Sequence, residues 1–292
     1  HGLSHTLSPA MFNAILPDVL PGAEYKVFDI PASDLGSFVR TAHESGIVGF
    51  NVTIPHKVAV IPFLDSLDET ASALGAVNCV SVGTDGIRVG HNTDASAFEA
   101  CIRDLDRRFD SALILGAGGA ARAVVHALSN VGVPLIVVAE RRSAAFEHFL
   151  RPADAGAHPP AHAPSAGNRP PSTVDPLAGL PRIPFDPRVL SQEAPEFSLI
   201  VNCTPVGMFP NLDASPLEAG FRSGQVVFDL VYRPRPTRLL RLAMAAGATP
   251  VDGLCMLARQ AAESLRLWTG IEVPHERFLA AAEESASRCT SA

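Results

Sequence analysis

A glycine-rich turn between an apolar run and an amphipathic stretch lies near the middle of the chain. Gly116-Ala117-Gly118-Gly119-Ala120-Ala121 has the spacing G-x-G-x-x-A and directly follows the apolar residues 112–115. After the turn, apolar residues recur at helical spacing, namely Val124, Ala127, Leu128 and Val131. Glycines permit a tight turn and close backbone approach, and a helix N-terminus offers unpaired N–H groups to an anion. The sequence therefore predicts a strand, turn and helix that bind the pyrophosphate of a dinucleotide.

Short apolar runs alternate with helical stretches through the second half of the chain. They lie at residues 112–115, 135–138, 199–201, 226–229 and 248–251. This alternation is typical of a parallel, doubly wound sheet with helices on both faces. Residues 151–195 interrupt it with many Pro, Ala and His residues and little periodicity. We interpret this segment as a surface insertion that carries no chemistry.

The first part of the chain has a different pattern. We expect strands at residues 25–30 and 48–53 around a helix at residues 33–44, which together make a βαβ unit. Further elements follow: a helix at 64–74, a hairpin of 79–82 and 87–89 turning at Asp85-Gly86, and a helix at 95–109. A helix at 254–268 carries an apolar stripe and is expected to pack back on this part.

The predicted fold is α/β with two domains. Residues 1–95 plus 253–292 form an N-terminal mixed α/β substrate domain. Residues 96–252 form a doubly wound, Rossmann-type NAD(P)-binding domain with the Pro/Ala-rich insertion 151–195. We expect a substrate that binds between the two domains, because open α/β sheets bind ligands at the carboxyl ends of their strands.

Composition excludes several classes of protein. The 292 residues are 47% hydrophobic and 18% charged, as in a globular protein, and the net charge of −7 disfavours nucleic-acid binding. No apolar run is long enough to span a membrane. The five cysteines are scattered without a CxxC spacing, so neither a disulfide framework nor a metal site is expected. We predict a cytoplasmic protein, either a monomer or a homodimer.

The choice of dinucleotide depends on Glu140, Arg141 and Arg142, which follow the second strand of the predicted parallel sheet. An acidic side chain at this distance from the glycine turn would accept hydrogen bonds from a ribose 2′-OH and favour NAD. Guanidinium groups there would bind a 2′-phosphate and favour NADP. A third interpretation is that all three side chains are solvated surface charges. The residues themselves leave these alternatives open.

Two polar segments of the first domain are candidates for chemistry. Asn51-Val-Thr53-Ile-Pro55-His-Lys57 leaves a strand and turns at proline, and Asn92-Thr93-Asp94 follows the hairpin. Both are expected to face the cleft between the domains. Each also has a simpler explanation, because Lys57 could be a surface charge and Asp94 could be the N-cap of the next helix.

Taken together, the motifs of this chain resemble those of the shikimate dehydrogenase family. The motifs that carry this resemblance are, in order, His5-Thr6-Leu7-Ser8-Pro9, Asn51 to Lys57, Gly75-Ala-Val-Asn78, Asn92 to Asp94, Gly116 to Ala120, Asn202-Cys-Thr204-Pro-Val-Gly-Met208, Asp229-Leu-Val-Tyr232-Arg-Pro234 with Thr237, and Gly253-Leu-Cys-Met256-Leu with Gln260. They cover nearly the whole chain except the insertion. The family also usually has a strand before the first motif, so the edge of the first sheet is expected to be incomplete here.

The resemblance implies an enzyme that reduces 3-dehydroshikimate to shikimate with NADPH, in the biosynthesis of chorismate and aromatic amino acids. It implies that Lys57 and Asp94 are the catalytic pair. The substrate contacts it implies are Thr6, Ser8, Thr53, Asn78, Tyr232 and Gln260. The implied cofactor contacts are Gly116, Ala117, Gly118, Gly119, Ala120, Glu140, Arg141, Arg142, Thr204, Gly253 and Met256.

Two other functions stay open at this point. Glu140 favours an NAD-dependent quinate/shikimate dehydrogenase of catabolism, and Thr6 stands where the family usually has serine, which could alter the preference between shikimate and quinate. A non-catalytic metabolite sensor could retain the same fold. The presence of both Lys57 and Asp94 argues against the sensor, since a sensor has no use for a proton-transfer pair.

Overall fold

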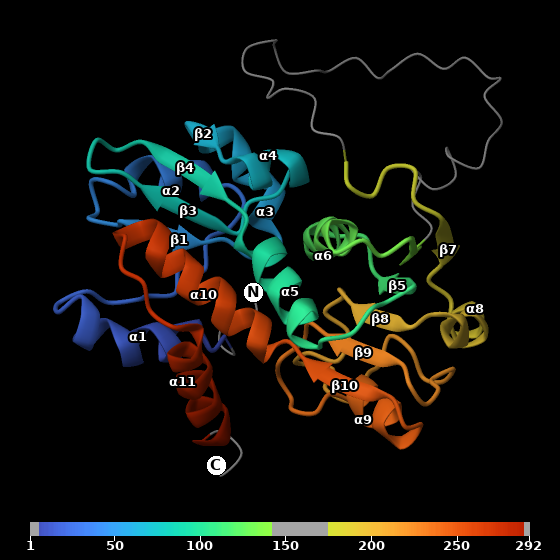
Figure 1. Ribbon diagram of the computed structural model, residues 1–292. Coiled ribbons are helices and arrows are strands. Elements are labelled where there is room, and N and C mark those ends of the chain that lie inside the picture. The colour runs from blue at the N-terminus through green and yellow to red at the C-terminus, as the bar shows by residue number, and fades with distance from the viewer. Residues whose placement is uncertain (1–5, 142–174, 289–292) are drawn as a thin grey trace, which may run out of the picture.

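The computed structural model describes residues 6–141 and 175–288, which form two sheets with a group of helices between and beside them (Figure 1). The first sheet is mixed and the second is parallel. The α/β class and the two-sheet organisation predicted from the sequence are confirmed. The exact domain boundaries, 1–95 plus 253–292 and 96–252, stay a prediction.

The first sheet has the strand order β1-β3-β4-β2. Its strands are β1 (Gly49–Asn51), β2 (Ser66–Leu67), β3 (Cys79–Val82) and β4 (Arg88–His91). The predicted hairpin is confirmed, because β3 and β4 pair antiparallel. Helices α2 (Leu35–Thr41), α3 (His56–Ala59) and α4 (Glu69–Leu74) and the 3-10 turn η2 (Ile61–Phe63) belong to the same region. Its core includes Val39, Val60 and Val80.

Two predictions for this region are wrong. Residues 25–30 form no strand; Val27 and Phe28 are about half exposed, and β1 pairs antiparallel with β3, so there is no βαβ unit here. Among the described residues β1 is therefore an edge strand. The predicted helix at 64–74 is shorter than expected, since α4 begins only at Glu69, after β2. Its N-cap is Asp68, whose carboxylate accepts a hydrogen bond from Ala71 N.

The second sheet is parallel throughout, with the strand order β10-β9-β8-β5-β6-β7. Its strands are β5 (Ser111–Leu115), β6 (Leu135–Glu140), β7 (Arg182–Pro184), β8 (Leu199–Asn202), β9 (Val226–Asp229) and β10 (Thr249–Asp252). From β5 the chain adds β6 and β7 on one side, and it then returns to place β8, β9 and β10 on the other side of β5. This reversal between β5 and β8 is where doubly wound sheets bind ligands. The predicted parallel sheet is confirmed.

Helices α6 (Gly119–Asn130), α8 (Pro187–Glu193) and α9 (Arg238–Ala245) and the 3-10 turn η3 (Ala194–Glu196) flank this sheet. Alternate residues of each strand face opposite sides, so Ile114 belongs to one apolar cluster and Leu113 to the other. Of the predicted insertion, residues 151–174 lie outside the described residues. Residues 175–195 are part of the fold, because they supply β7, α8 and the buried Leu177 and Leu190. Periodicity missed them because β7 and α8 are short.

Helices α5 (Thr93–Asp104) and α10 (Leu254–Thr269) lie at the centre of the molecule in Figure 1, between the two sheets. Helices α1 (Ser8–Val19) and α11 (His275–Arg288) pack beside α10, where Phe12, Leu265 and Phe278 are buried together. The expectation that residues 254–268 pack back on the first part of the chain is confirmed by contacts between α10 and β3. Within the described ranges, no helix is both long and apolar enough to cross a membrane.

The contact between α5 and the second sheet gives a first prediction. Phe98 of α5 and Phe228 of β9 are fully buried, with ring centroids 4.9 Å apart. We expect Phe98→Ala to lower the free energy of unfolding by about 3–5 kcal/mol, because the cavity it leaves lies in a packed core. Urea denaturation measures the loss. Leu135→Ala, at a residue that is 45% exposed, serves as the control and should change stability far less; equal losses in both variants would contradict the packing described.

Candidate active site

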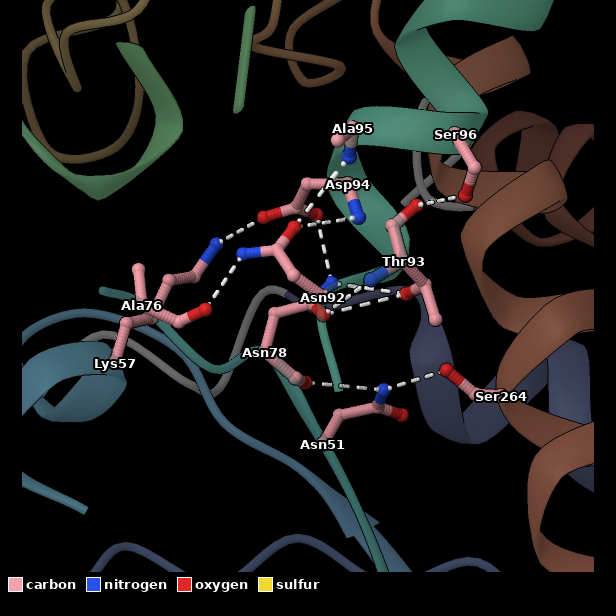
Figure 2. Close-up of polar contacts among 10 residues, drawn as sticks. All are labelled: Asn51, Lys57, Ala76, Asn78, Asn92, Thr93, Asp94, Ala95, Ser96 and Ser264. Carbon is pink, nitrogen blue, oxygen red and sulfur yellow. Dashed lines mark hydrogen bonds and ion pairs between the residues drawn. The ribbon is translucent and has the colours of Figure 1, made fainter. Parts of the chain in front are cut away.

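A short ion pair joins Lys57 and Asp94, which are 37 residues apart in the sequence (Figure 2). Lys57 Nζ lies 2.6 Å from Asp94 Oδ2, and the two side chains are only 16% and 10% exposed. Lys57 is in α3, directly after the turn that follows β1, and its carbonyl oxygen accepts a hydrogen bond from Val77 N at 2.8 Å. The interpretation of Lys57 as an isolated surface charge is therefore wrong.

Asn78 fixes the carboxylate side of this pair. Its Nδ2 donates to Asp94 Oδ1 at 2.8 Å and to Thr93 Oγ1 at 3.0 Å, while its Oδ1 accepts from Thr93 N at 2.7 Å. Figure 2 shows the three side chains grouped at the start of α5. Since Lys57 and Asn78 donate to different oxygens of Asp94, both oxygens are held in place.

The N-cap of α5 is Asn92, and the interpretation of Asp94 as that cap is wrong. Asn92 Oδ1 accepts hydrogen bonds from Asp94 N at 3.2 Å and Ala95 N at 3.4 Å. Its Nδ2 donates to Ala76 O at 2.8 Å, which ties the helix start to the segment before Asn78. Because Asn92 satisfies the first N–H groups of the helix, the Asp94 carboxylate is available to Lys57.

A second polar cluster gathers near the start of α1. Thr6 Oγ1 lies 3.2 Å from Ser8 Oγ. The Tyr232 hydroxyl lies near Thr6 and the Tyr25 hydroxyl near Ser8, close enough for each to influence the pKa of the tyrosine. Burial raises the pKa of Tyr232 and of Tyr25, so both hydroxyls stay protonated and can donate. Three of the predicted substrate contacts, Thr6, Ser8 and Tyr232, are thus close together.

A chain of hydrogen bonds connects this cluster to α10. Tyr25 Oη donates to Asn51 Oδ1 at 3.0 Å, Asn51 Nδ2 donates to Ser264 Oγ at 2.9 Å, and Ser264 Oγ donates to the carbonyl oxygen of Gln260 at 2.8 Å. Gln260 is buried, whereas Thr53 is exposed. The sequence reasoning missed Tyr25, Asn51 and Ser264 as parts of the site. The position of Asn51 at the start of the Lys57 motif was the one available signal.

The glycine turn lies close to the side chain of Lys57. A Cβ added to Gly119, the first residue of α6, would lie 3.6 Å from Lys57 Cδ, so about the width of a methyl group separates this glycine from the Lys57 side chain. Gly116 has a φ of +106°, and a Cβ there would lie 2.9 Å from Thr204 Cγ2. Gly118 is the N-cap of α6 and has open space beside it, so the first N–H groups of α6 are free of a side-chain cap. These features suit a pyrophosphate.

A buried network holds the neighbouring loop after β8. Asn202 Nδ2 donates to Asp229 Oδ1 at 2.8 Å, and Asn202 Oδ1 accepts from the Thr204 hydroxyl at 2.7 Å. Thr237 Oγ1 donates to Asp229 Oδ2 at 2.6 Å. Desolvation raises the pKa of Asp229 to about 6, although the hydrogen bonds from Thr237, Val231 and Asn202 oppose it. Thr204 is thereby fixed beside Gly116.

The remaining predicted cofactor contacts differ in burial and in the partners that they bind. Glu140, the last residue of β6, forms a 2.6 Å ion pair with Arg182 of β7. Arg141 is exposed, and Arg142 lies outside the described residues. A Cβ on Gly253 would lie 2.3 Å from Leu230 O, so this glycine is required by close packing of the backbone. The other residues named from the resemblance are Ala117 in the turn, Ala120 in the first turn of α6, and the buried Met256.

Comparison with known proteins identifies the family. The substrate binding domain of shikimate dehydrogenase matches residues 1–80, and the C-terminal domain of shikimate 5′-dehydrogenase matches residues 253–283. An NADP⁺ shikimate dehydrogenase of Methanopyrus kandleri is 40% identical over 281 residues, covering 94% of this chain and 90% of the relative. The chain belongs to the shikimate dehydrogenase family.

Two solved structures place this shikimate dehydrogenase family member among its relatives. The Thermus thermophilus shikimate 5-dehydrogenase, solved with NADP(H) and shikimate, has a TM-score of 0.76 at 31% identity and covers 98% of this chain and 97% of its own. The quinate dehydrogenase of Corynebacterium glutamicum, solved with NAD, has a TM-score of 0.73 at 28% identity, with coverages of 97% and 96%. Proteins similar in structure to this chain thus include enzymes named for either substrate.

Asp229 gives a prediction on pH. Its folded-state pKa of about 6 lies above the ordinary value of 3.8 for an aspartate, so the folded state binds the proton more tightly than the unfolded state. The stability that the proton supplies is complete below pH about 4 and is lost as the pH rises through about 6. We expect the free energy of unfolding of the wild type, relative to Asp229→Asn, to fall by on the order of 3 kcal/mol across this window.

Urea denaturation at a series of pH values between about 4 and 7 checks this linkage. Asp213→Asn is the matched control, because the Asp213 side chain is 93% exposed and its replacement should leave the pH profile unchanged. If the free energies of unfolding of the wild type and Asp229→Asn differed by the same amount at every pH, Asp229 would not titrate in this window.

Proposed function

We propose that this chain is an NADP-dependent shikimate dehydrogenase, which reduces 3-dehydroshikimate to shikimate reversibly and belongs to the biosynthesis of chorismate and aromatic amino acids. One observation carries the proposal: Lys57, held in a largely buried ion pair with Asp94, has its side chain within about a methyl group's width of Gly119 of the dinucleotide turn. A proton-transfer group next to a nucleotide site is what a nicotinamide-dependent alcohol dehydrogenase needs. The names and bound ligands of the relatives support the choice of substrate and cofactor.

The proposed role of Lys57 is to move the proton of the reacting hydroxyl. NADPH, when bound, supplies the hydride that adds to the ketone carbon. The protonated Lys57 amine donates a proton to the ketone oxygen, and in the oxidation direction the neutral amine accepts that proton back. The Asp94 carboxylate holds the amine in place through the 2.6 Å contact, and Asn78 holds the carboxylate. Asp94 thus orients the proton donor.

The other proposed contacts suit a polyol with a carboxylate. Thr6 and Ser8 present hydroxyl groups within 3.2 Å of each other, and they are proposed to bind the ring carboxylate with help from Tyr232. Asn78 and Gln260 carry amides, which can both donate to and accept from ring hydroxyls. Thr53 is exposed, so it can contact the substrate only from the rim of the site. A site of this kind discriminates by leaving polar groups unpaired against a wrong substrate.

A second candidate function is an NAD-dependent quinate/shikimate dehydrogenase. The observation that favours it is Glu140, which stands where an acidic side chain would accept a ribose 2′-OH. Its ion pair with Arg182 weakens this argument, because the carboxylate already has a partner. A metabolite sensor without catalysis is disfavoured by the buried Lys57–Asp94 pair. Cytoplasmic location and a monomeric or homodimeric state stay predictions from the sequence.

A spectrophotometric assay of the reduced nicotinamide tests the proposal, with shikimate and quinate each combined with NADP and NAD. We expect the highest kcat/KM for shikimate with NADP. Lys57→Ala should lower kcat by about 10²–10⁴, because the proton acceptor is removed while both ligands can still bind. Lys26→Ala is the matched control: the chain has two lysines, and Lys26 is 61% exposed in a surface ion pair with Glu24.

The outcomes separate the candidate functions. A preference for quinate with NAD, lost in Lys57→Ala, would replace the proposed function by the catabolic one. Nucleotide binding without turnover of either substrate would favour the sensor. If Lys57→Ala kept the activity of Lys26→Ala, the proposed proton-transfer role of Lys57 would be wrong.

A further inference from the structure

Glu140 and Arg182 form a partly buried ion pair at the carboxyl end of β6. Arg182 Nη1 lies 2.6 Å from Glu140 Oε2, and the side chains are only 20% and 13% exposed. Arg182 Nη2 also donates to Leu177 O at 3.0 Å, so the guanidinium has two fixed partners. The strands hold the pair in register, since β6 and β7 are parallel and Phe185 N donates to Glu140 O at 2.8 Å.

This pair lies beside the glycine turn. Gly116 N donates to the carbonyl oxygen of Ala139, the residue before Glu140, at 2.8 Å. The end of β6 is therefore adjacent to the turn that would hold the pyrophosphate, and in doubly wound sheets this is the place of the adenosine ribose. Arg141 follows directly and its side chain is exposed, so it is available to a ligand.

The charges at this point decide between the two dinucleotides. A free carboxylate at Glu140 would repel a 2′-phosphate and accept a hydrogen bond from a 2′-OH, which favours NAD. A carboxylate neutralised by a guanidinium repels the phosphate much less. Within the described ranges, the end of β6 carries one carboxylate, that of Glu140, and the guanidinium groups of Arg141 and Arg182. Without Arg182, the Glu140 carboxylate would oppose the attraction of Arg141 for a 2′-phosphate.

The geometry points to Arg182 as a positioning residue for cofactor specificity: it neutralises Glu140 and so allows Arg141 to bind the 2′-phosphate of NADP. The inference rests on the proposed function and deepens it, because it assigns the cofactor preference to a residue of β7, within the segment 151–195 that the sequence suggested carries no chemistry. Arg182 acts through Glu140 and needs no contact with the cofactor itself.

A double-mutant cycle tests this role in the full-length chain. The dissociation constants of NADPH and NADH are measured by isothermal titration calorimetry for the wild type, Arg182→Met, Glu140→Gln and the double variant. We expect the wild type to bind NADPH more tightly. Arg182→Met should weaken NADPH binding about tenfold, because the carboxylate is left unpaired, and should leave NADH binding unchanged or tighter. The double variant should regain the NADPH affinity of Glu140→Gln.

A purely structural role of Arg182 gives a different result. Damage to β7 would weaken NADPH and NADH binding by the same factor and would not be rescued by Glu140→Gln. That result would overturn the inference, as would a wild type that binds NADH at least as tightly as NADPH. Arg188→Met, on α8 in an exposed position, is the control for loss of an arginine and should change neither constant.

The binding measurements also keep this inference distinct from the proposed function. A wild type that prefers NADPH and follows the predicted cycle, yet turns over no shikimate, would support the role of Arg182 and contradict the proposed reaction. In an active enzyme, Arg182→Met should raise KM for NADP while kcat at saturating NADP is kept, because Arg182 lies away from the Lys57–Asp94 pair. A fall in kcat with an unchanged KM would overturn the inference.

Discussion

The ion pair between Lys57 and Asp94 is the contact on which the rest of the site depends. Both side chains are largely removed from solvent, so each charge needs the other, and loss of either would leave an unpaired charge. Asn78 restricts the pair further by binding the second carboxylate oxygen and the start of α5. An amine held in this way has a fixed position relative to any substrate, which general acid–base chemistry requires.

The order of elements along the chain explains how this pair reaches the nucleotide turn. Helix α5 begins at the Asn92 cap beside Lys57 and is followed directly by β5, whose carboxyl end carries the glycine turn. Phe98 of the same helix packs against Phe228 of the second sheet. One helix therefore carries Asp94 at its start and is fixed to the nucleotide-binding sheet along its length. In the proposed function, this helix connects the proton-transfer residue to the sheet that binds the cofactor.

Sequence patterns predicted what depends on local periodicity and motif spacing: the parallel strands, the hairpin, the glycine turn, and Lys57 with Asp94 as candidates. Apart from the return of α10 to the first part of the chain, they did not predict which distant side chains contact one another. Apolar alternation at residues 25–30 suggested a strand, but a strand needs a partner, and in the structure Tyr25 binds the Asn51 side chain instead. Arg182 was missed because its three-residue strand gives almost no periodic signal. Its ion-pair partner, Glu140, lies 42 residues earlier in the chain.

A crystal structure of the chain with NADP⁺ and shikimate tests the central claim most directly, through the distance from Lys57 Nζ to the ring hydroxyl that is oxidised. The account predicts a hydrogen bond of about 2.7–3.2 Å, with Asp94 still bound to Lys57 and Asn78. If that hydroxyl instead bonded to another titratable side chain while Lys57 lay beyond hydrogen-bond distance, the assignment of Lys57 as the proton-transfer residue would be contradicted.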